Sequence, residues 1–562
     1  MEQDGKKFVL NARRHSISVF EDVKSMKFKS FTIRLFVASI VCLGAFAAVG
    51  AMRPVSRLAT ITGMPVVTDD DEEESSVKKD PNDVAKDWEK PDVTLFISGR
   101  QHGYIEPCGC ITLARQKGGM MRRHRVQKIL QARGWDLIPI DAGNQVRRFG
   151  QQPLLKLSKT YEGMCKVMKY DAIGLGPDDL KLPSLELVQT MANVFNGDNI
   201  PFMCANVEVL DESLTQKFVI VERAGKKVGI TMVIGNEYLE DLKKRDGLTV
   251  QKAEDGVAMA AQKMKAAGCD AMVLMAFTNM ESSRNLAKSF PVFDLLVTAG
   301  GAGDPTFQPE VVQGNGHATP MIQVGVKGMY VGLVGLTFEG GKAKVKYERV
   351  ALEHQFEDTE EIKGVFLSYQ NELKRLWLAG ALADIKPRDH PSGLKFVGSG
   401  ACADCHGEEF DIWADGVDGD GGPHEKATQD LAQNPNDDRV WVQRQYDPEC
   451  MSCHATGWNP QKFYPYKSGL IDVTKHDHLF GNGCENCHGP GSAHVAMEEL
   501  AAKQQVDEVK LAATRKQMHL TLKDARANAC KECHDLDNSP DFLKEGGFDK
   551  YWPKIEHGDG KD

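Results

Sequence analysis

The chain has 562 residues and a formal net charge of −10, with 79 acidic side chains against 69 basic ones. Because an acidic protein repels the phosphate backbone, this charge argues against nucleic acid as a partner. The length allows more than one hydrophobic core, so we expect a multidomain protein.

An apolar segment lies near the N-terminus. Residues 35–52 are LFVASIVCLGAFAAVGAM and follow three basic residues between positions 27 and 34. This pattern is typical of a secretory signal, with cleavage after Ala47 or Ala51 and a true start at Met26. The alternative for residues 1–52 is a signal anchor that stays in the membrane, although about 18 residues barely span a bilayer. Both alternatives predict an extracytoplasmic protein, and we expect it in a bacterial periplasm, either soluble or tethered through residues 35–52.

Residues 53–91 show no apolar periodicity. They include six acidic residues in a row at positions 69–74. Such a run repels itself and stays solvated, so this segment is predicted to be an acidic linker.

Residues 92–352, called the α/β region below, have the pattern of sheets covered by helices. Short apolar runs bounded by glycine, aspartate or asparagine alternate with helix-like stretches. Residues 321–350 favour antiparallel strands with a hairpin turn at Gly340-Gly341. The clearest apolar runs are 93–99, 137–143, 172–176, 271–277 and 295–300.

The stretches ISGRQHGYIEPCGC, GGMMRR, IDAGNQ, YDAIGLGPDD, FMCANV and DAMVLMAF follow one another through this region. In order and spacing they resemble the 5'-nucleotidase-like branch of the metallophosphatases. The resemblance implies an α/β sandwich, which in that family holds two metal ions.

Most ligand positions of that family carry other residue types here. His102 matches the first histidine of the family, but a two-metal hydrolase also needs carboxylates and further imidazoles. We therefore expect the fold without its original metal centre, and residual hydrolase activity is the alternative. The substituted positions are Arg100, Asn144, Pro177-Asp178, Phe277-Thr278 and Gly300, Gly301, Ala302 and Gly303.

Two cysteines lie one residue apart in the first of these stretches. Cys108 and Cys110 follow His102 closely, so the three side chains are candidate catalytic residues for thiol redox chemistry or ligands of an additional metal. The alternative is a pair of thiols in a tight glycine turn. The sequence does not decide between these roles.

Residues 353–395 are expected to connect this region to the next. Within them, residues 360–378 place apolar side chains at helical spacing, which predicts one helix with a buried stripe.

Four copies of Cys-x-x-Cys-His lie in residues 396–562, called the haem-motif region below. This spacing lets two thiols bond to one haem while the following histidine reaches the iron, so we expect four haem c groups and a mainly α-helical multihaem domain. Zinc sites or a disulfide framework would leave the four histidines unexplained. The attachment cysteines and proximal histidines are Cys402, Cys405 and His406; Cys450, Cys453 and His454; Cys484, Cys487 and His488; and Cys530, Cys533 and His534.

The stretches CADCHGEEFDIW with PHEKA after it, CMSCHATGW, GCENCHGPGSAHV, CKECHDLDNSP and YWPKIEHG resemble the tetrahaem cytochrome c family that takes electrons from hydroxylamine oxidation. The resemblance implies distal iron ligands outside the haem motifs and one haem that can keep an open position. By their place in these stretches, His424, His494 and His557 are the expected distal ligands, with His519 and His478 as alternatives.

We therefore expect a periplasmic tetrahaem cytochrome c fused behind a degenerate metallophosphatase-like domain. Its function would be electron transfer between redox partner proteins that the sequence does not name. The alternatives are an oxidoreductase that binds a small nitrogen or sulfur compound at an open haem, and residual hydrolase or thiol-redox activity of the α/β region. Whether the protein is an enzyme is left open.

Overall fold

The computed structural model describes residues 80–107, 116–195, 200–382, 385–419, 421–432, 442–535, 538–539 and 541–558. The apolar segment 35–52, the acidic run and both Cys108 and Cys110 lie outside the described residues. Within these ranges, no helix is long and apolar enough to cross a membrane. The chain from Asp71 to Asp562 forms one compact unit.

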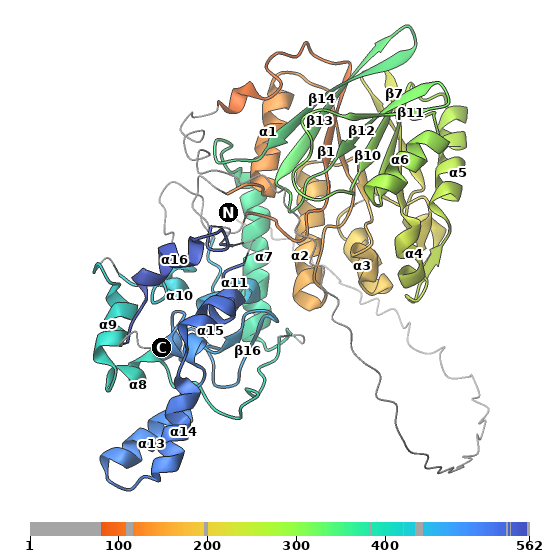
Figure 1. Ribbon diagram of the computed structural model, residues 1–562. Coiled ribbons are helices and arrows are strands. Elements are labelled where there is room, and N and C mark those ends of the chain that lie inside the picture. Colours follow the sequence, from red (N-terminus) through yellow and green to blue (C-terminus); the bar gives the residue numbers. More distant parts are fainter. Residues whose placement is uncertain are drawn as a thin grey trace, which may run out of the picture. The chain divides into compact units, whose positions relative to one another are not determined.

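Two six-stranded sheets form the centre of the α/β region (Figure 1). The first has the strand order β14 (Lys342–Ala351), β13 (Tyr330–Glu339), β1 (Val93–Ser98), β2 (Leu137–Asp141), β3 (Ala172–Gly174) and β4 (Phe202–Met203). The second has the order β11 (Glu310–Gly314), β12 (His317–Gln323), β10 (Leu295–Thr298), β9 (Ala271–Phe277), β7 (Lys226–Ile234) and β6 (Phe218–Arg223). Strands β5 (Val207–Val209) and β8 (Leu248–Val250) form a separate antiparallel pair.

Both sheets are parallel at their centre and antiparallel at their edges. Strands β1 to β4 run parallel in the first sheet, and β7, β9, β10 and β12 run parallel in the second. The predicted runs at 93–99, 137–143, 172–176, 271–277 and 295–300 are all strands. The hairpin between β13 and β14 turns at Gly340 and Gly341, whose φ angles of 58° and 78° suit glycine in a two-residue turn.

The side chains of β9 show how the layers are built. Every residue of β9 is buried, which requires cover on both faces. Val273 and Met275 join the core that includes the first sheet, whereas Met272 and Leu274 pack with residues of helices α5 and α6. Helices α1, α2 and α7 cover the first sheet on its other side (Figure 1). The predicted α/β sandwich is thus confirmed.

The helices of the α/β region are of ordinary length, and α7 ends the region. Helix α7 coincides with the predicted helix at residues 360–378 and buries Ile362, Phe366 and Leu373. The bounds are α1 (Met120–Ala132), α2 (Gln151–Glu162), α3 (Ser184–Ala192), α4 (Asn236–Leu242), α5 (Ala253–Ala266), α6 (Met280–Ser289) and α7 (Glu360–Leu378).

The haem-motif region consists of short helices joined by loops, as expected. The only strands in its described part, β15 (Trp458–Asn459) and β16 (Tyr464–Pro465), form a two-residue ladder. The helices are α8 (Ser399–Ala403), α9 (Gly407–Asp415), α10 (Ala427–Asp430), α11 (Pro448–His454), α12 (Cys484–His488), α13 (Ser492–Ala502), α14 (Glu508–Met518), α15 (Leu522–Ala527) and α16 (Gly547–Tyr551).

Candidate functional site

Each Cys-x-x-Cys-His motif forms a helical turn. In the first motif the backbone N–H of His406 donates to the carbonyl of Cys402 at 2.9 Å, and in the fourth the N–H of His534 donates to Cys530 at the same distance. The second and third motifs lie in α11 and α12. Residues at positions i, i+3 and i+4 share one face of a helix, so each motif presents two thiols and one imidazole on the same side.

Three of the motif histidines face a histidine from elsewhere in the sequence. The paired imidazoles are those of His406 and His494, with ring centroids 6.4 Å apart, His424 and His534 at 6.1 Å, and His488 and His557 at 5.8 Å. Two imidazoles on opposite sides of one metal ion have centroids about 6 Å apart, since a metal–nitrogen bond is about 2 Å and each ring centroid lies about 1 Å behind its nitrogen. The three spacings therefore fit an iron held between two histidines.

Hydrogen bonds at Nδ1 leave Nε2 of these rings available for iron. Nδ1 of His488 donates to the carbonyl of Met518 at 2.7 Å. A carbonyl accepts only, so it fixes the proton on Nδ1 and the lone pair on Nε2. Nδ1 of His557 is bonded to the carbonyl of Ile555 in the same way at 2.8 Å.

Histidine binds iron as a neutral imidazole. Burial, and then the neighbouring His534 and His454, lower the pKa of His424 to about 4. Burial also lowers the pKa of His494. Both rings are therefore neutral near pH 7, the form in which they would bind a metal.

Thiols of different motifs lie next to one another. A hydrogen bond with Cys484 and burial raise the pKa of the Cys402 thiol, and the same hydrogen bond lowers the pKa of Cys484 to about 6. The motifs are thus neighbours in an order that differs from their order in the sequence. Hydrogen bonds join Cys402 to Cys484 and Cys453 to Cys533, whereas Cys530 acts on Cys487 only through its charge.

Glu485, inside the third motif, holds the loops around it. The side chain is buried, and its carboxylate accepts backbone N–H groups of Val397 at 2.9 Å, Gly398 at 2.7 Å and Gly491 at 2.7 Å. These bonds fix the segment before the first motif and the start of α13, which carries His494. Sequence reasoning missed this role, because a glutamate inside a haem motif has no distinctive pattern.

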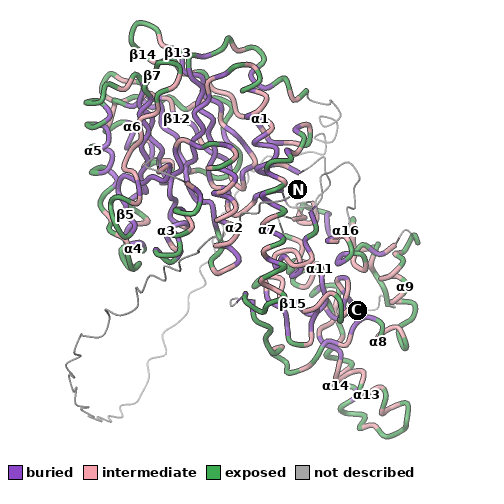
Figure 2. Tube along the Cα trace, turned by 180° about the vertical axis from the view of Figure 1, so that it is seen from behind, coloured by how far each residue is buried: buried purple, intermediate pink, exposed green. Residues whose placement is uncertain are grey.

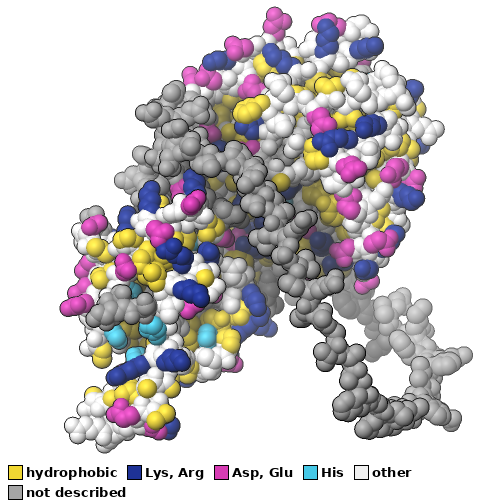
Figure 3. Space-filling view, viewed as in Figure 1, with side chains coloured by type: hydrophobic (Ala, Val, Ile, Leu, Met, Phe, Trp, Pro, Cys, Tyr) yellow, Lys and Arg dark blue, Asp and Glu magenta, His cyan; other side chains and the backbone are white. Residues whose placement is uncertain are grey.

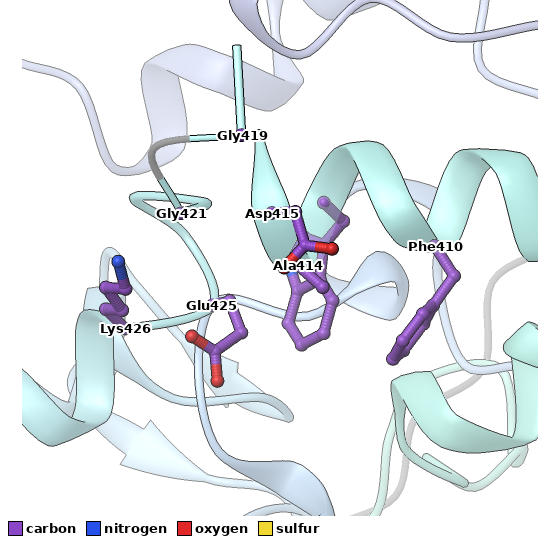
Figure 4. A pocket seen from close by; sticks show the side chains of 8 residues that line it. Phe410, Ala414, Asp415, Gly419, Gly421, Glu425 and Lys426 are labelled. Atoms are coloured by element: carbon purple, nitrogen blue, oxygen red, sulfur yellow. The ribbon is translucent and has the colours of Figure 1, made fainter. Parts of the chain in front are cut away.

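A cavity of about 490 Å³ lies beside the segment that carries His424 (Figure 4). Figure 4 shows Phe410 and Asp415 on α9 and, across the cavity, Glu425 and Lys426. In the view of Figure 3, the visible histidine side chains gather over the haem-motif region. Across the described ranges, no three His, Cys, Asp or Glu side chains are grouped so that they could hold a metal ion by themselves.

Several residues at positions where metallophosphatases carry metal ligands lie together at the carboxyl ends of the strands. Arg100 donates through Nη1 to the carbonyl of Gly301 at 3.0 Å, and Asn144 donates through Nδ2 to Asp178 at 2.9 Å. A Cβ on Gly143 would lie 2.6 Å from the backbone nitrogen of Gly176, so glycine is needed for this close approach. The substituted residues therefore bond to one another.

His102 lies at the same edge of the sheet in a cationic environment. Burial, and then Arg100 and Arg147, lower the pKa of His102 to about 4. Its φ of 53° and the φ of 50° at Arg100 are left-handed, a conformation that non-glycine residues rarely adopt. The proposed grouping of His102 with Cys108 and Cys110 cannot be described, because both cysteines lie outside the described residues.

A cluster of charged and polar side chains joins the α/β region to the start of α11. Glu449 accepts from Lys156 of α2 at 2.6 Å and from Arg148 at 3.1 Å. Gln370 of α7 donates to Asp447 at 2.9 Å. We call these five residues the junction cluster. The Asp447-Pro448 pair is a recognisable helix start, but its partners lie about 80 to 300 residues away in the sequence and left no signal there.

A third ion pair crosses the same junction. Arg444 lies 2.6 Å from Glu106, and only 7% of each side chain is exposed. Trp377 of α7 donates to the carbonyl of Ile471 at 2.8 Å and stacks on Trp458 with centroids 5.5 Å apart. The α/β region and the second haem motif are therefore fixed against each other by polar and apolar contacts.

Comparison with known proteins confirms the resemblance of the haem-motif region. The family model described as cytochrome c554 and c-prime matches residues 401–489. The cytochrome c-554 of Nitrosomonas europaea is 29% identical over 103 residues, which is 17% of this chain and 39% of that protein. The chain thus spans well under half the length of this relative. The match implies haem c as the cofactor.

Solved structures similar to the chain come from another group of proteins. One is a 5'-nucleotidase precursor from Thermus thermophilus, 19% identical with a TM-score of 0.43, covering 50% of this chain and 59% of that one. Another is the calcineurin-like phosphoesterase YfkN from Bacillus subtilis, 18% identical with a TM-score of 0.40, covering 50% and 97%.

Proposed function

We propose that this protein is an extracytoplasmic multihaem c-type cytochrome that transfers electrons through four covalently bound haems. The observation that carries the proposal is the set of three imidazole pairs at 5.8 to 6.4 Å, each joining a motif histidine to a distant histidine. Haem c supplies one-electron redox chemistry when bound. Its donor and acceptor would be redox partner proteins.

The imidazole pairs support a specific ligand assignment. His494 would be the distal ligand of the first haem, His557 that of the third and His424 that of the fourth, opposite His406, His488 and His534. Two neutral imidazoles on one iron favour a low-spin haem that exchanges electrons without binding substrate. An open position on the haem held by His454 would be the basis of the alternative oxidoreductase function, and carbon monoxide binding to that haem would reveal it.

The thiol contacts support an order for the haems. Thiol hydrogen bonds join the first motif to the third and the second to the fourth, and the third and fourth motifs interact electrostatically through Cys487 and Cys530. Electrons would follow this order along the protein. The second haem would then be at the end of the series, next to the junction cluster.

The α/β region would act as a support for the second haem rather than as a two-metal hydrolase. Arg100 and Asn144 occupy two positions where metallophosphatases carry metal ligands. Arg100 donates a hydrogen bond to Gly301, and Asn144 donates one to Asp178. A guanidinium at a metal position repels a cation, which disfavours metal-assisted hydrolysis there.

The test is the haem content of protein purified from a host that attaches haem c. Mass spectrometry and the pyridine haemochrome spectrum are expected to give four haems per chain. The double variant Cys402→Ala/Cys405→Ala should give three, and Cys165→Ala, which changes a thiol of the α/β region, should keep four. Fewer than four haems in the unaltered protein would contradict the proposal.

A further inference from the structure

Two acidic residues at the start of α11, Asp447 and Glu449, precede the second haem motif and have different electrostatic surroundings. Asp447 caps α11, and its side chain accepts the N–H of Glu449 at 3.1 Å. Its carbonyl accepts the N–H of Cys450 at 3.0 Å, so the carboxylate lies one turn before the first attachment cysteine of this motif.

Glu449 is neutralised by two cations. Lys156 lies at 2.6 Å from one carboxylate oxygen and Arg148 at 3.1 Å from the other. Despite burial, Lys156 and then Arg148 lower the pKa of Glu449. Glu449 therefore stays ionised, and its side chain, 26% exposed, borders solvent.

Asp447 has no such cation. Its residue is only 4% exposed, and its side-chain partners are the amide of Gln370 at 2.9 Å and the backbone of α11. Among the described residues, no lysine or arginine nitrogen forms an ion pair with it. Burial raises the pKa of Asp447, Lys156 lowers it, and the negative charge of Glu449 raises it again.

The other groups around Asp447 do not supply a second positive charge to it. Tyr369 of α7 is fully buried, and burial raises its pKa well above its usual value, so it stays neutral. Arg444, whose carbonyl accepts the N–H of Asp447, directs its guanidinium to Glu106. Arg148 is engaged by Glu449.

Gln370 can form a hydrogen bond with Asp447 in either protonation state. Its Nε2 donates to the carboxylate, whereas its Oε1 is buried without a hydrogen-bond partner. A rotation of the amide by half a turn would present Oε1 as an acceptor for a protonated Asp447. A buried amide oxygen without a partner costs free energy, so a protonated neighbour would satisfy it.

We infer that Asp447 is a proton-binding site coupled to the haem attached at Cys450 and Cys453, and that it takes up a proton when this haem is reduced. The inference rests on the proposed function. One electron from an external one-electron reductant converts the haem iron from ferric to ferrous. One proton from water converts the Asp447 carboxylate to the carboxylic acid. The added charge on the haem is thus balanced inside the junction cluster.

The coupling follows from linkage. An electron added close to a buried carboxylate makes its negative charge less favourable, so the affinity of Asp447 for a proton is higher beside the reduced haem than beside the oxidised haem. The proton must in turn favour reduction by the same free energy. The midpoint potential of this haem therefore falls as pH rises through the range in which Asp447 loses its proton.

The experiment measures the midpoint potential of each haem in the full, haem-loaded protein between pH 5 and 9, by spectroelectrochemical titration. One of the four potentials should fall with pH, toward the slope of one proton per electron. The Asp447→Asn variant should make that potential independent of pH and leave the other three unchanged, because asparagine also caps a helix. Asp507→Asn, at the exposed cap of α14, is the matched control and should keep the pH dependence.

A second variant keeps the test decisive if Asp447→Asn fails to load haem. Lys156→Met removes the cation that lowers the pKa of Asp447, so the pH-dependent range should move to higher pH. An unchanged range in Lys156→Met, or a persisting pH dependence in Asp447→Asn, would overturn the inference while leaving the proposed function intact. A haem count below four in the unaltered protein would overturn the proposed function instead.

Discussion

The α/β region and the haem-motif region differ in what fills their interiors. In the α/β region all residues of β1, β2 and β9 are buried. In the haem-motif region, helices α9 and α13 bury no residue at all. Figure 2 shows the same contrast, with buried chain concentrated in the sheets and half-buried or exposed chain around α13 and α14. The α/β region is filled by its own side chains, whereas only part of the haem-motif region, around Met451, Trp458 and Leu470, joins the buried core, and α9 and α13 stay outside it.

The two regions should differ in what stabilises their folds. Burial of apolar side chains stabilises a domain by about 25 cal/mol per Å², and the sheets supply this from the protein alone. Helices α9 and α13, with nine and eleven residues and none of them buried, are too short to be stable by themselves. The haem-motif region should therefore depend on its cofactor, whereas the α/β region should not.

We expect the largest difference between the two regions in protein that lacks haem. In a host without the machinery for haem c attachment, we expect the region after residue 396 to be unfolded and the sheets to remain. Limited proteolysis followed by mass spectrometry would show fragments ending near residue 390 and protection of residues 93–351. The haem-loaded protein is the control. Equal protease resistance in the two regions of the haem-free protein would contradict the idea that haem supplies the second core.

Substitutions of comparable chemistry should have unequal effects in the two regions. Leu296 in β10 is completely buried, so Leu296→Ala should lower the free energy of unfolding by about 2–5 kcal/mol. Val509 in α14 is 80% exposed, so Val509→Ala should change it by less than about 0.5 kcal/mol. Urea unfolding of the haem-loaded protein, followed by circular dichroism, measures both. A similar loss in the two variants would show that the helices hide a core of their own.

The same contrast explains which parts of the fold could be predicted from the sequence. The buried strands are continuous apolar runs, such as residues 271–277, and α7 repeats apolar side chains every three or four residues. Both signals are local. The Cys-x-x-Cys-His motifs are local too, because both thiols and the imidazole must share one helical turn.

Other parts of the site depend on contacts between distant segments. The resemblance pointed to His424, His494 and His557, but it did not show which motif each one faces. The pairing of His488 with His557 bridges 69 residues of sequence. The junction cluster joins Lys156 to Glu449 across 293 residues, and no periodicity or motif connects them. Such pairs are fixed by how the helices pack.

The stability of the α/β region should depend on pH through His102. Its pKa is lowered to about 4 in the folded protein by burial and nearby cations, against about 6.5 in the unfolded chain. Between these values the unfolded chain binds more protons, so stability falls as pH falls from 6.5 to 4, by up to about 3 kcal/mol.

The measurement is urea unfolding at pH 7 and pH 4.5. His102→Asn should lose much less stability on acidification than the unaltered protein, since asparagine tolerates the left-handed backbone at this position. His354→Asn, at an exposed histidine two residues beyond the α/β region, is the control and should behave like the unaltered protein. An equal loss in His102→Asn would assign the acid sensitivity to other groups.

The smallest expected effect is a change in the spin state of one haem in the haem-motif region. His494 lies opposite His406 with ring centroids 6.4 Å apart, so His494→Ala should convert one haem from low-spin to high-spin and let it bind carbon monoxide. His478 instead lies beside His476, with centroids 6.2 Å apart and rings nearly perpendicular, so His478→Ala should leave every haem unchanged. Electron paramagnetic resonance before and after adding carbon monoxide distinguishes the two variants. Because haem attachment is covalent, the loss of one axial ligand should leave four haems per chain in both, and the α/β region should unfold at the same urea concentration. A high-spin haem in His478→Ala and none in His494→Ala would reverse the ligand assignment without changing the folds of the two regions.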